Sequence, residues 1–328
     1  MKSILIFSIV FVTNIALFGQ KVDYTIPKGY EIDINPKDYK TLVDAAIVVI
    51  TKRYKVDFVK EGTIYLVKNE DLQAMNLHNL IGKCIVFKDK SKWKQVIEEH
   101  CNGMFSTIDE QKKINPTDYE TIKKYLSIRI YREDYVDQQG GKDNIVTKID
   151  IEGTYTVLML DLPEAFRTVE KSMFELWKKE QSEVFQIAQS NINQQKIDKV
   201  TKEFKVDSSE ISVHFLGNED YAASYALDLM NNSPELIGSW GSVVAMPNKG
   251  LVNICKISKE KPLDFVKFIQ FIKKPVERFY SKHPQPISNQ FFWYYKGKFK
   301  RINVLEDKNG NINVISPMGL TELMTVKR

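Results

Sequence analysis

The chain has 328 residues, of which 43% are hydrophobic and 27% are charged. This composition excludes a disordered protein and provides enough apolar side chains for two domains or one large one. The net charge of +5 is small for this length and gives no indication of a polyanionic partner, so we expect a globular protein that does not bind nucleic acid.

The first twenty residues predict an export signal. Lys2 precedes an apolar run from Ile4 to Phe18, and Gly19-Gln20 leads into polar sequence. The run is shorter than the ~20 residues that span a bilayer, and it is typical of a cleavable signal peptide. We therefore expect cleavage near Gly19-Gln20 after a signal at 1–19. The mature chain should be periplasmic or secreted, with no transmembrane segment and no cysteine for a lipid anchor.

The chain has three cysteines, Cys84, Cys101 and Cys255. An odd number in an oxidising compartment leaves at least one thiol unpaired. Cys84 and Cys101 could form a disulfide, which would close a loop worth about 3 kcal/mol. The alternative is that all three are buried thiols that act as small hydrophobic residues, which their apolar neighbours Ile85 and Ile254 favour.

Residues 20–110 predict an N-terminal α+β unit. Asn35 can cap a helix, Pro36 suits the first helical position, and Asp38 lies where the helix dipole favours an anion. Apolar and polar residues then alternate about Glu61-Gly62, which predicts a hairpin. The expected elements are a helix at 36–53, strands at 54–59, 63–67 and 84–87, and a helix at 91–104.

The helix-start sequence occurs twice. The segments 34–41 and 114–121 agree at six of eight positions, and an apolar residue follows each. They could be an internal duplication, but Asn-Pro-x-Asp is also a common way to begin a helix. The similarity fades after Ile122, which favours the second interpretation.

Residues 111–205 predict a middle unit and residues 206–328 a C-terminal unit. The polar, lysine-rich segment 194–209 between them is the best candidate for a domain boundary. Asn218 should cap a helix, Asn309-Gly310 should turn the chain into a last strand, and Pro275 should kink or shorten the helix that contains it. The expected helices are 169–193, 219–230 and 265–279, and the expected strands are 126–131, 153–162, 211–216, 242–246, 251–256, 290–295, 299–304 and 312–315. This order predicts an α+β fold, rich in hairpins, with mostly antiparallel sheets, packed helices and repeated α-β-β-α style units.

Motifs for catalysis, metals and cofactors are missing, so we expect no catalytic residues, no metal site and no cofactor. The sequence has no nucleophile elbow, P-loop or zinc-protease motif, and 238–242 (Gly-Ser-Trp-Gly-Ser) has the wrong spacing and predicts a loop. Its four histidines lack metal-ligand spacing, and His214, in an apolar strand, is expected in the core. Asp307 and the alternating asparagines after it resemble a calcium loop, but the glycine is misplaced and a hairpin explains them.

An aromatic run, Phe291–Tyr295, is followed by Lys296, Lys298, Lys300 and Arg301. This pattern could form a ligand-binding strip. In an extended chain, however, its rings alternate between two sides, which favours a strand buried on both faces. Stacking of carbohydrate or peptide on Trp293 remains an alternative.

Four segments carry a resemblance to a known family: 127–131, 155–163 with Phe166-Arg167, 218–224 and 243–249. Together they resemble the bacterial family catalogued as domain of unknown function 1444, over about 35–304. The resemblance implies an α+β fold and no established activity. This chain departs from the family in its export signal, at 219–223, where the family tends to show Asp-Gly-Tyr-Asp-Ala, and at Gly250, where it tends to show an acidic residue.

We therefore expect a non-catalytic binding or scaffold protein of the cell envelope, with an envelope ligand or protein as partner. The candidate binding residues lie where the matching segments should converge: Arg129, Asp161, Arg167, Tyr221, Pro247 and Asn248. The alternative is a hydrolase that acts on envelope material through carboxylates, such as Asp161 with Glu164 or Asp220.

Overall fold

The structure is a computed structural model that describes residues 21–68, 72–87, 89–162, 165–206 and 209–325. The predicted signal peptide and Glu164 lie outside these residues. The chain divides into two compact units, Met1–Asp109 and Glu110–Arg328, and the second unit contains the residues of both the expected middle and C-terminal units. Within the described residues, no helix combines the length and apolar character that a membrane crossing requires.

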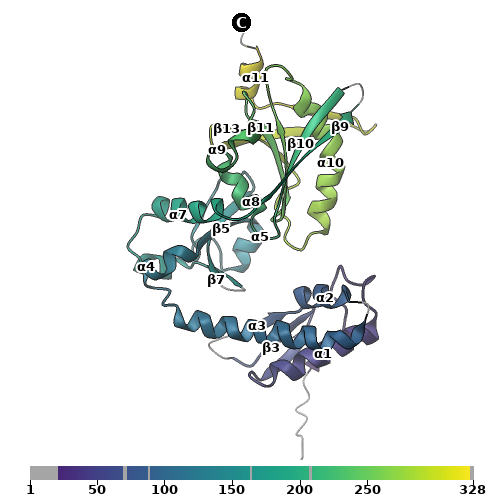
Figure 1. Ribbon diagram of the computed structural model, residues 1–328, viewed down its shortest axis with the longest axis vertical. Coiled ribbons are helices and arrows are strands. Elements are labelled where there is room, and N and C mark those ends of the chain that lie inside the picture. Colours follow the sequence, from purple (N-terminus) through teal and green to yellow (C-terminus); the bar gives the residue numbers. More distant parts are fainter. Residues whose placement is uncertain (1–20, 69–71, 88, 163–164, 207–208, 326–328) are drawn as a thin grey trace, which may run out of the picture. The chain divides into compact units, whose positions relative to one another are not determined.

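The described part of the first unit is a four-stranded sheet with three α-helices and a one-turn 3-10 helix (Figure 1). Strands β1 and β2 are parallel, and the other neighbours are antiparallel. In sheet order the strands are β1 (Lys21–Val22), β2 (Val56–Lys60), β3 (Thr63–Leu66) and β4 (Ala74–Asn76), and the helices are α1 (Pro36–Ile50), α2 (His78–Ile85), the one-turn η1 (Lys90–Lys92) and α3 (Trp93–Lys113), which continues past the end of the unit.

Helix α1 begins as predicted, because the side chain of Asn35 accepts a hydrogen bond from the backbone N–H of Asp38 at 3.0 Å. The predicted strand at 84–87 is wrong. Cys84 lies in α2, where Leu80, Ile81 and Cys84 share one buried helix face. The third antiparallel strand is instead β4.

The second unit contains a middle sheet and a larger C-terminal sheet. In the middle sheet β7 pairs with β5, β6 and β8, and β5 lies at an edge. Its strands are β5 (Leu126–Arg132), β6 (Thr147–Lys148), β7 (Thr154–Leu162) and β8 (Ala165–Thr168), and its helices are α4 (Tyr119–Ile122), η2 (Lys123–Tyr125), α5 (Glu133–Gln138), α6 (Lys171–Leu176) and α7 (Gln181–Asn193).

One expectation for this region is wrong, and for the repeated helix-start sequence the structure agrees with the favoured interpretation. The predicted helix at 169–193 is broken into α6 and α7, with Lys178 at a φ of 51° between them. The second helix-start sequence does not repeat the first, because Asp118, not Asn115, caps the four-residue α4. The two similar segments therefore begin elements of different length.

The C-terminal sheet has seven antiparallel strands in the order β15-β14-β13-β11-β12-β10-β9. Its strands are β9 (Asp198–Val206), β10 (Ser209–Gly217), β11 (Ser242–Asn248), β12 (Leu251–Lys256), β13 (Phe291–Tyr295), β14 (Lys298–Glu306) and β15 (Ile312–Ile315), and its helices are α8 (Ala222–Tyr225), η3 (Ala226–Asp228), α9 (Leu229–Asn232), η4 (Pro234–Leu236), α10 (Asp264–Lys282) and α11 (Met318–Thr325).

Three further expectations differ from the structure. The candidate domain boundary at 194–209 contains β9, an edge strand whose lysines suit an exposed sheet edge, and the chain on both sides of it belongs to one compact unit. The predicted helix at 219–230 is a series of short helical turns. Helix α10 continues through Pro275 without being shortened.

The central strands of the seven-stranded sheet are buried on both faces. Phe292 and Tyr294 join the core shared with the middle sheet, whereas Phe291 and Trp293 join the core under α10 and α11. Figure 1 shows α10 along one face of this sheet. The prediction of a doubly buried aromatic strand is therefore confirmed, as is the α+β class with mostly antiparallel sheets.

Several residues examined for chemistry have structural roles. All three cysteines are buried free thiols, and burial raises the pKa of Cys84 and of Cys101 to about 11. His214 is buried in β10, with Nδ1 2.8 Å from the Thr201 hydroxyl. The Asp307 carboxylate accepts hydrogen bonds from the backbone N–H groups of Asn309 and Asn311, as a tight turn requires.

The segment 238–242 forms a tight turn. Gly238 and Gly241 exchange backbone hydrogen bonds of 3.1 and 2.9 Å. A Cβ on Gly238 would lie 2.2 Å from the Ile257 carbonyl oxygen, so the close approach of two backbones requires glycine there. The two glycines therefore have a structural role in this turn.

Candidate functional site

Five ionisable side chains of the second unit meet in one group, which we call the charged cluster: Arg129, Asp161, Asp220, Tyr221 and Lys249. They come from β5, β7, the turn after β10 and the turn between β11 and β12. The cluster thus joins the middle sheet to one end of the seven-stranded sheet.

The turn after β10 is positioned by local hydrogen bonds. The Asn218 side chain accepts from the backbone N–H groups of Asp220 and Tyr221, each at 2.9 Å. The Gly250 carbonyl accepts from Asn218 N–H at 3.2 Å, and the Lys249 carbonyl accepts from Ala223 N–H at 3.1 Å. These bonds tie the turn to the β11–β12 hairpin instead of starting a long helix.

Gly250 allows these two turns to approach each other. A Cβ at this position would lie 3.2 Å from the Asn218 carbonyl oxygen and 3.3 Å from that of Glu219. The acidic side chain that the resemblance implies here would therefore crowd two backbone carbonyls. Ser224, in the short helix α8 that follows the turn after β10, donates its hydroxyl to the Ile128 carbonyl at 2.8 Å. This bond holds α8 along the edge strand β5.

Asp220 forms ion pairs with two cations, Arg129 and Lys249, the second at 2.6 Å. Burial would raise the pKa of Asp220, but its hydrogen bond and ion pair with Lys249, together with the charge of Arg129, outweigh burial and lower it. The Arg129 side chain is only 7% exposed, and its guanidinium carbon lies 3.5 Å from the centroid of the Phe166 ring. Asp220 is therefore held as a carboxylate by groups that are themselves fixed.

The surroundings of Asp161 shift its pKa in the opposite direction from that of Asp220. Burial raises the pKa of Asp161, and the nearby charge of Asp220 adds to this, whereas the Tyr221 hydrogen bond and the charge of Arg129 oppose it. The Tyr221 hydroxyl donates to Asp161 Oδ2 at 2.5 Å, and burial together with this bond raises the pKa of the Tyr221 phenol. The two carboxyl groups of the cluster therefore differ in the direction of their pKa shifts.

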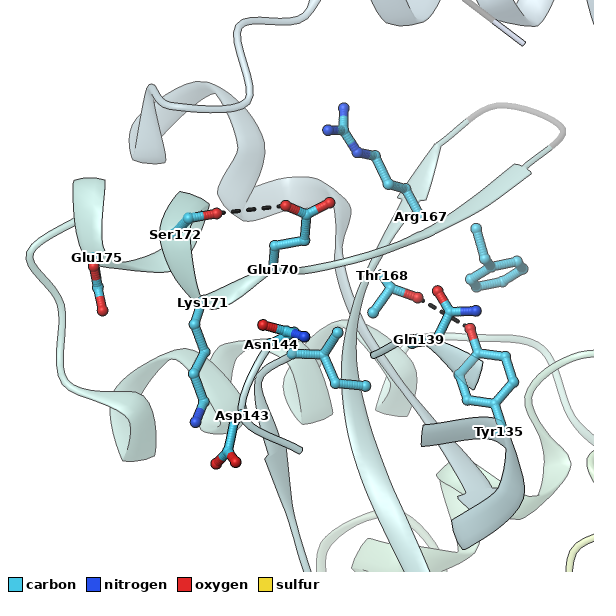
Figure 2. A pocket seen from close by; sticks show the side chains of 12 residues that line it. Tyr135, Gln139, Asp143, Asn144, Arg167, Thr168, Glu170, Lys171, Ser172 and Glu175 are labelled. Carbon is cyan, nitrogen blue, oxygen red and sulfur yellow. Dashed lines mark hydrogen bonds between the residues drawn. The ribbon is translucent and has the colours of Figure 1, made fainter. Parts of the chain in front are cut away.

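A pocket of about 860 Å³, which we call the β8 pocket, opens beside the cluster. Figure 2 shows that its lining comes from α5 and the following loop, from β8 and from the start of α6. The Tyr135 and Thr168 hydroxyls lie 3.0 Å apart, and Ser172 donates to Glu170 at 3.4 Å (Figure 2). The lining residues are Tyr135, Gln139, Asp143, Asn144, Ile145, Phe166, Arg167, Thr168, Glu170, Lys171, Ser172 and Glu175.

Phe166 connects the β8 pocket with the charged cluster. Its ring lines the pocket, stacks on the Arg129 guanidinium and lies 5.8 Å from the Tyr221 ring. Neither Asp161 nor Asp220 lines this pocket. A ligand in the pocket would therefore touch the cluster through Phe166, not through a carboxylate.

The structure places the six candidate binding residues in three groups. Arg129, Asp161 and Tyr221 meet in the charged cluster, and Arg167 lines the β8 pocket. Pro247 and Asn248 lie in β11 before Lys249, where the Asn248 side chain accepts from the Gly250 N–H at 3.0 Å and so supports the hairpin turn.

Sequence reasoning did not single out Lys249 or Phe166 as site residues, although both lie in the segments that carried the resemblance. It also passed over Lys171, Asp143 and Glu175. Those charges lie in ordinary polar sequence, and no pattern in the sequence marks them.

Comparison of the chain with protein-family models, with curated proteins and with solved structures finds no match.

Proposed function

We propose that this protein is an exported, non-catalytic binding protein of the cell envelope, and that its ligand occupies the β8 pocket. Its relation to the family catalogued as domain of unknown function 1444 is part of the same proposal and rests on the four short segments. The β8 pocket has a volume in the range of ligand-binding sites.

One contrast carries the proposal. The ionisable groups of the charged cluster, which are buried or half-buried, are paired with one another. In the β8 pocket, by contrast, Arg167 and Lys171 make no side-chain hydrogen bond or ion pair with any described residue, and the same holds for Asp143 and Glu175. Charged groups without partners around a hollow are available to a ligand, whereas paired ones are not.

The unpaired groups indicate the chemistry of the ligand. They include both signs of charge, and the amides Gln139 and Asn144 stand among them. A short peptide with free amino and carboxyl groups matches such a lining, because each end finds an opposite charge and the peptide groups find hydrogen-bond partners. In the cell envelope, the peptide stems of peptidoglycan also carry charges of both signs, because they have free carboxyl groups and a free amino group on the side chain of a diamino acid.

The binding test uses soluble peptidoglycan fragments and a short-peptide library. Saturation-transfer NMR should detect binding, and mass spectrometry of the same samples should show uncleaved ligands after prolonged incubation. Lys171→Gln should weaken binding, whereas Lys196→Gln, which removes an exposed lysine outside the pocket lining, should not. Failure of every fragment and peptide to bind, or their cleavage at enzyme-like rates, would overturn the proposal.

Export has its own test. Amino-terminal sequencing of the protein from the producing cell should find a mature chain that begins near Gln20, in the periplasm or the medium. A chain that still begins at Met1 in the cytoplasm would refute this part.

One observation favours a hydrolase as the second candidate. Asp161 has a raised pKa and Asp220 a lowered one, and opposite shifts in neighbouring carboxyl groups are the pattern of a general acid with a general base. The two cations that hold Asp220 weigh against it as a base. If the same fragments are cleaved by the wild-type chain and not by Asp161→Asn, the second function replaces the first.

A further inference from the structure

The far end of the seven-stranded sheet carries a second pocket, which we call the aromatic–lysine pocket, with a volume of about 530 Å³. It lies between the β13–β14 hairpin and α11. We propose that it binds an anionic sugar, that is, a sugar ring that carries a phosphate or carboxylate group. Its lining residues are Trp293, Tyr295, Lys296, Lys298, Lys300, Gly319, Glu322 and Leu323.

Strand register brings the aromatic rings and the lysines together. Trp293 lies directly opposite Lys300, and Tyr295 directly opposite Lys298. Side chains of directly opposite residues in antiparallel strands project from the same face of the sheet. The hairpin therefore sets a row of two rings beside a row of two ammonium groups, and Lys296 in the turn adds a third.

The aromatic part of the pocket is held by contacts on several sides. The Trp293 and Tyr295 rings stack with centroids 4.9 Å apart and an interplanar angle of 9°. Trp293 Nε1 donates to the Trp240 carbonyl at 2.7 Å, which fixes the indole. A Cβ on Gly319 would lie 3.2 Å from the indole ring, so glycine lets α11 close the pocket against Trp293.

The charge of the pocket is positive and uncompensated. Lys296, Lys298 and Lys300 make no side-chain hydrogen bond or ion pair within the described part of the chain, apart from contacts of Lys296 and Lys300 with ring faces. Glu322 is the one acidic side chain among the lining residues described. Three cations against one anion favour an anionic ligand, in contrast to the mixed charges of the β8 pocket.

The remaining features of the pocket indicate that the anionic group is attached to a sugar ring. Tyr295 is half-buried and one face of its ring stacks on Trp293, so the other face is the one that suits the C–H face of a sugar ring. The Glu322 carboxylate is an acceptor for sugar hydroxyls, and the ammonium groups are point charges that pair with phosphate or carboxylate oxygens. The volume suits one or two sugar rings.

Isothermal titration calorimetry of the mature chain tests this site with four probes: glucose 6-phosphate, glucuronic acid, glucose and inorganic phosphate. We expect glucose 6-phosphate, glucuronic acid or both to bind at least tenfold more tightly than glucose or inorganic phosphate, because each supplies both the ring and the charge. The difference in affinity between glucose 6-phosphate and glucuronic acid shows whether the pocket prefers a phosphate or a carboxylate group.

The variants Lys298→Gln, Lys300→Gln and Tyr295→Leu should each weaken binding by about tenfold. Lys202→Gln, on β9 at the opposite edge of the sheet, is the matched control and should bind as the wild type does. Circular dichroism confirms that each variant is folded. Lys171→Gln should also leave this binding unchanged, so failure of the β8 pocket proposal and failure of this one are distinguishable.

Four results would overturn the proposal. The first is that none of the four probes binds. The second is that inorganic phosphate binds as tightly as glucose 6-phosphate, since the sugar would then contribute nothing. The third is that the three pocket variants bind as tightly as Lys202→Gln. The fourth is that a thymidine oligonucleotide, titrated as a further probe, binds while the sugars do not.

Discussion

Replacing Arg129 with methionine tests whether the charged cluster holds the second unit together. Arg129→Met keeps an unbranched apolar chain in a side-chain site that is 7% exposed, but removes the guanidinium that pairs with Asp220 and covers Phe166. The variant therefore removes charge with little change in packing volume.

The expected cost follows from the surroundings of the guanidinium. Removing one partner of a fully buried ion pair costs about 3–5 kcal/mol, because the other charge is left buried and unpaired. Asp220 is 35% exposed and keeps Lys249, which lowers this to about 2 kcal/mol. Loss of the contact with Phe166 adds about 1 kcal/mol. Removing Nε, which is buried without a hydrogen-bond partner among the described residues, returns up to about 1 kcal/mol, so the net cost is about 2–3 kcal/mol.

Urea unfolding followed by tryptophan fluorescence measures this cost. Three of the four tryptophans, Trp177, Trp240 and Trp293, lie in the second unit, so the signal reports mainly on that unit. The matched control is Arg132→Met on the same strand. It loses an ion pair with Asp134, which is 57% exposed, and a 3.2 Å hydrogen bond to the half-buried Tyr280 hydroxyl, so it should cost no more than about 1 kcal/mol.

A double-mutant cycle with Asp220→Asn completes the test. Arg129→Met combined with Asp220→Asn should cost at least about 1 kcal/mol less than the sum of the single variants, because the unpaired carboxylate is then gone. Equal costs for Arg129→Met and Arg132→Met, or strictly additive costs in the cycle, would refute the reasoning.

The remaining predictions concern the carboxyl groups, the glycines and the thiols. Because its folded pKa is raised, Asp161 loses stabilising free energy as pH rises above about 4, so Asp161→Asn should gain stability relative to wild type from pH 4 to 7. The folded pKa of Asp220 is lowered, so its contribution is present above about pH 4 and lost in acid. The loss of unfolding free energy caused by Asp220→Asn should therefore grow as the pH rises from 4 to 7. The measurement is urea unfolding of each variant and of the wild type at several pH values. If the difference in unfolding free energy from the wild type changes with pH in the same direction for both variants, these assignments are contradicted. Gly103→Ala in α3, where a Cβ meets open space, should stabilise the first unit by about 0.5–1 kcal/mol, whereas Gly238→Ala should cost more than about 2 kcal/mol of unfolding free energy. Ellman's reagent should label the three buried thiols only after denaturant is added, and rapid labelling of the native chain would show that a thiol is accessible.

Elements with a local cause could be predicted from the sequence. Asn35 caps a helix because its side chain reaches an N–H three residues on, and Asn309-Gly310 turns the chain because of its own backbone preferences. Elements that depend on distant partners could not. The lysine-rich segment 194–209 has the composition of a linker, but it becomes β9 because β10 offers it a full row of backbone partners.

The same division applies to the candidate site. The sequence could suggest that Arg129, Asp161 and Tyr221 converge, because they lie in segments that carry one resemblance. It could not show that Asp220 turns toward Arg129, which is 91 positions away, because that turn is fixed by hydrogen bonds to Lys249 and Gly250 on another hairpin. Nor could it reveal the β8 pocket, which depends on the gap between three elements and not on any one of them.

Phe166 is the residue at which the stability of the cluster and the binding of a ligand should be coupled. Arg129→Met removes a charge that does not line the β8 pocket, so it should lower stability more than affinity, and Lys171→Gln should do the reverse. Phe166→Leu should do both, because the ring lines the pocket and also covers Arg129 and Tyr221. We expect it to cost about 1–2 kcal/mol in urea unfolding and to weaken peptide binding by about tenfold in the NMR titration. A Phe166→Leu protein that loses stability but binds peptide as tightly as wild type would place the ligand elsewhere and leave the cluster as a purely structural joint.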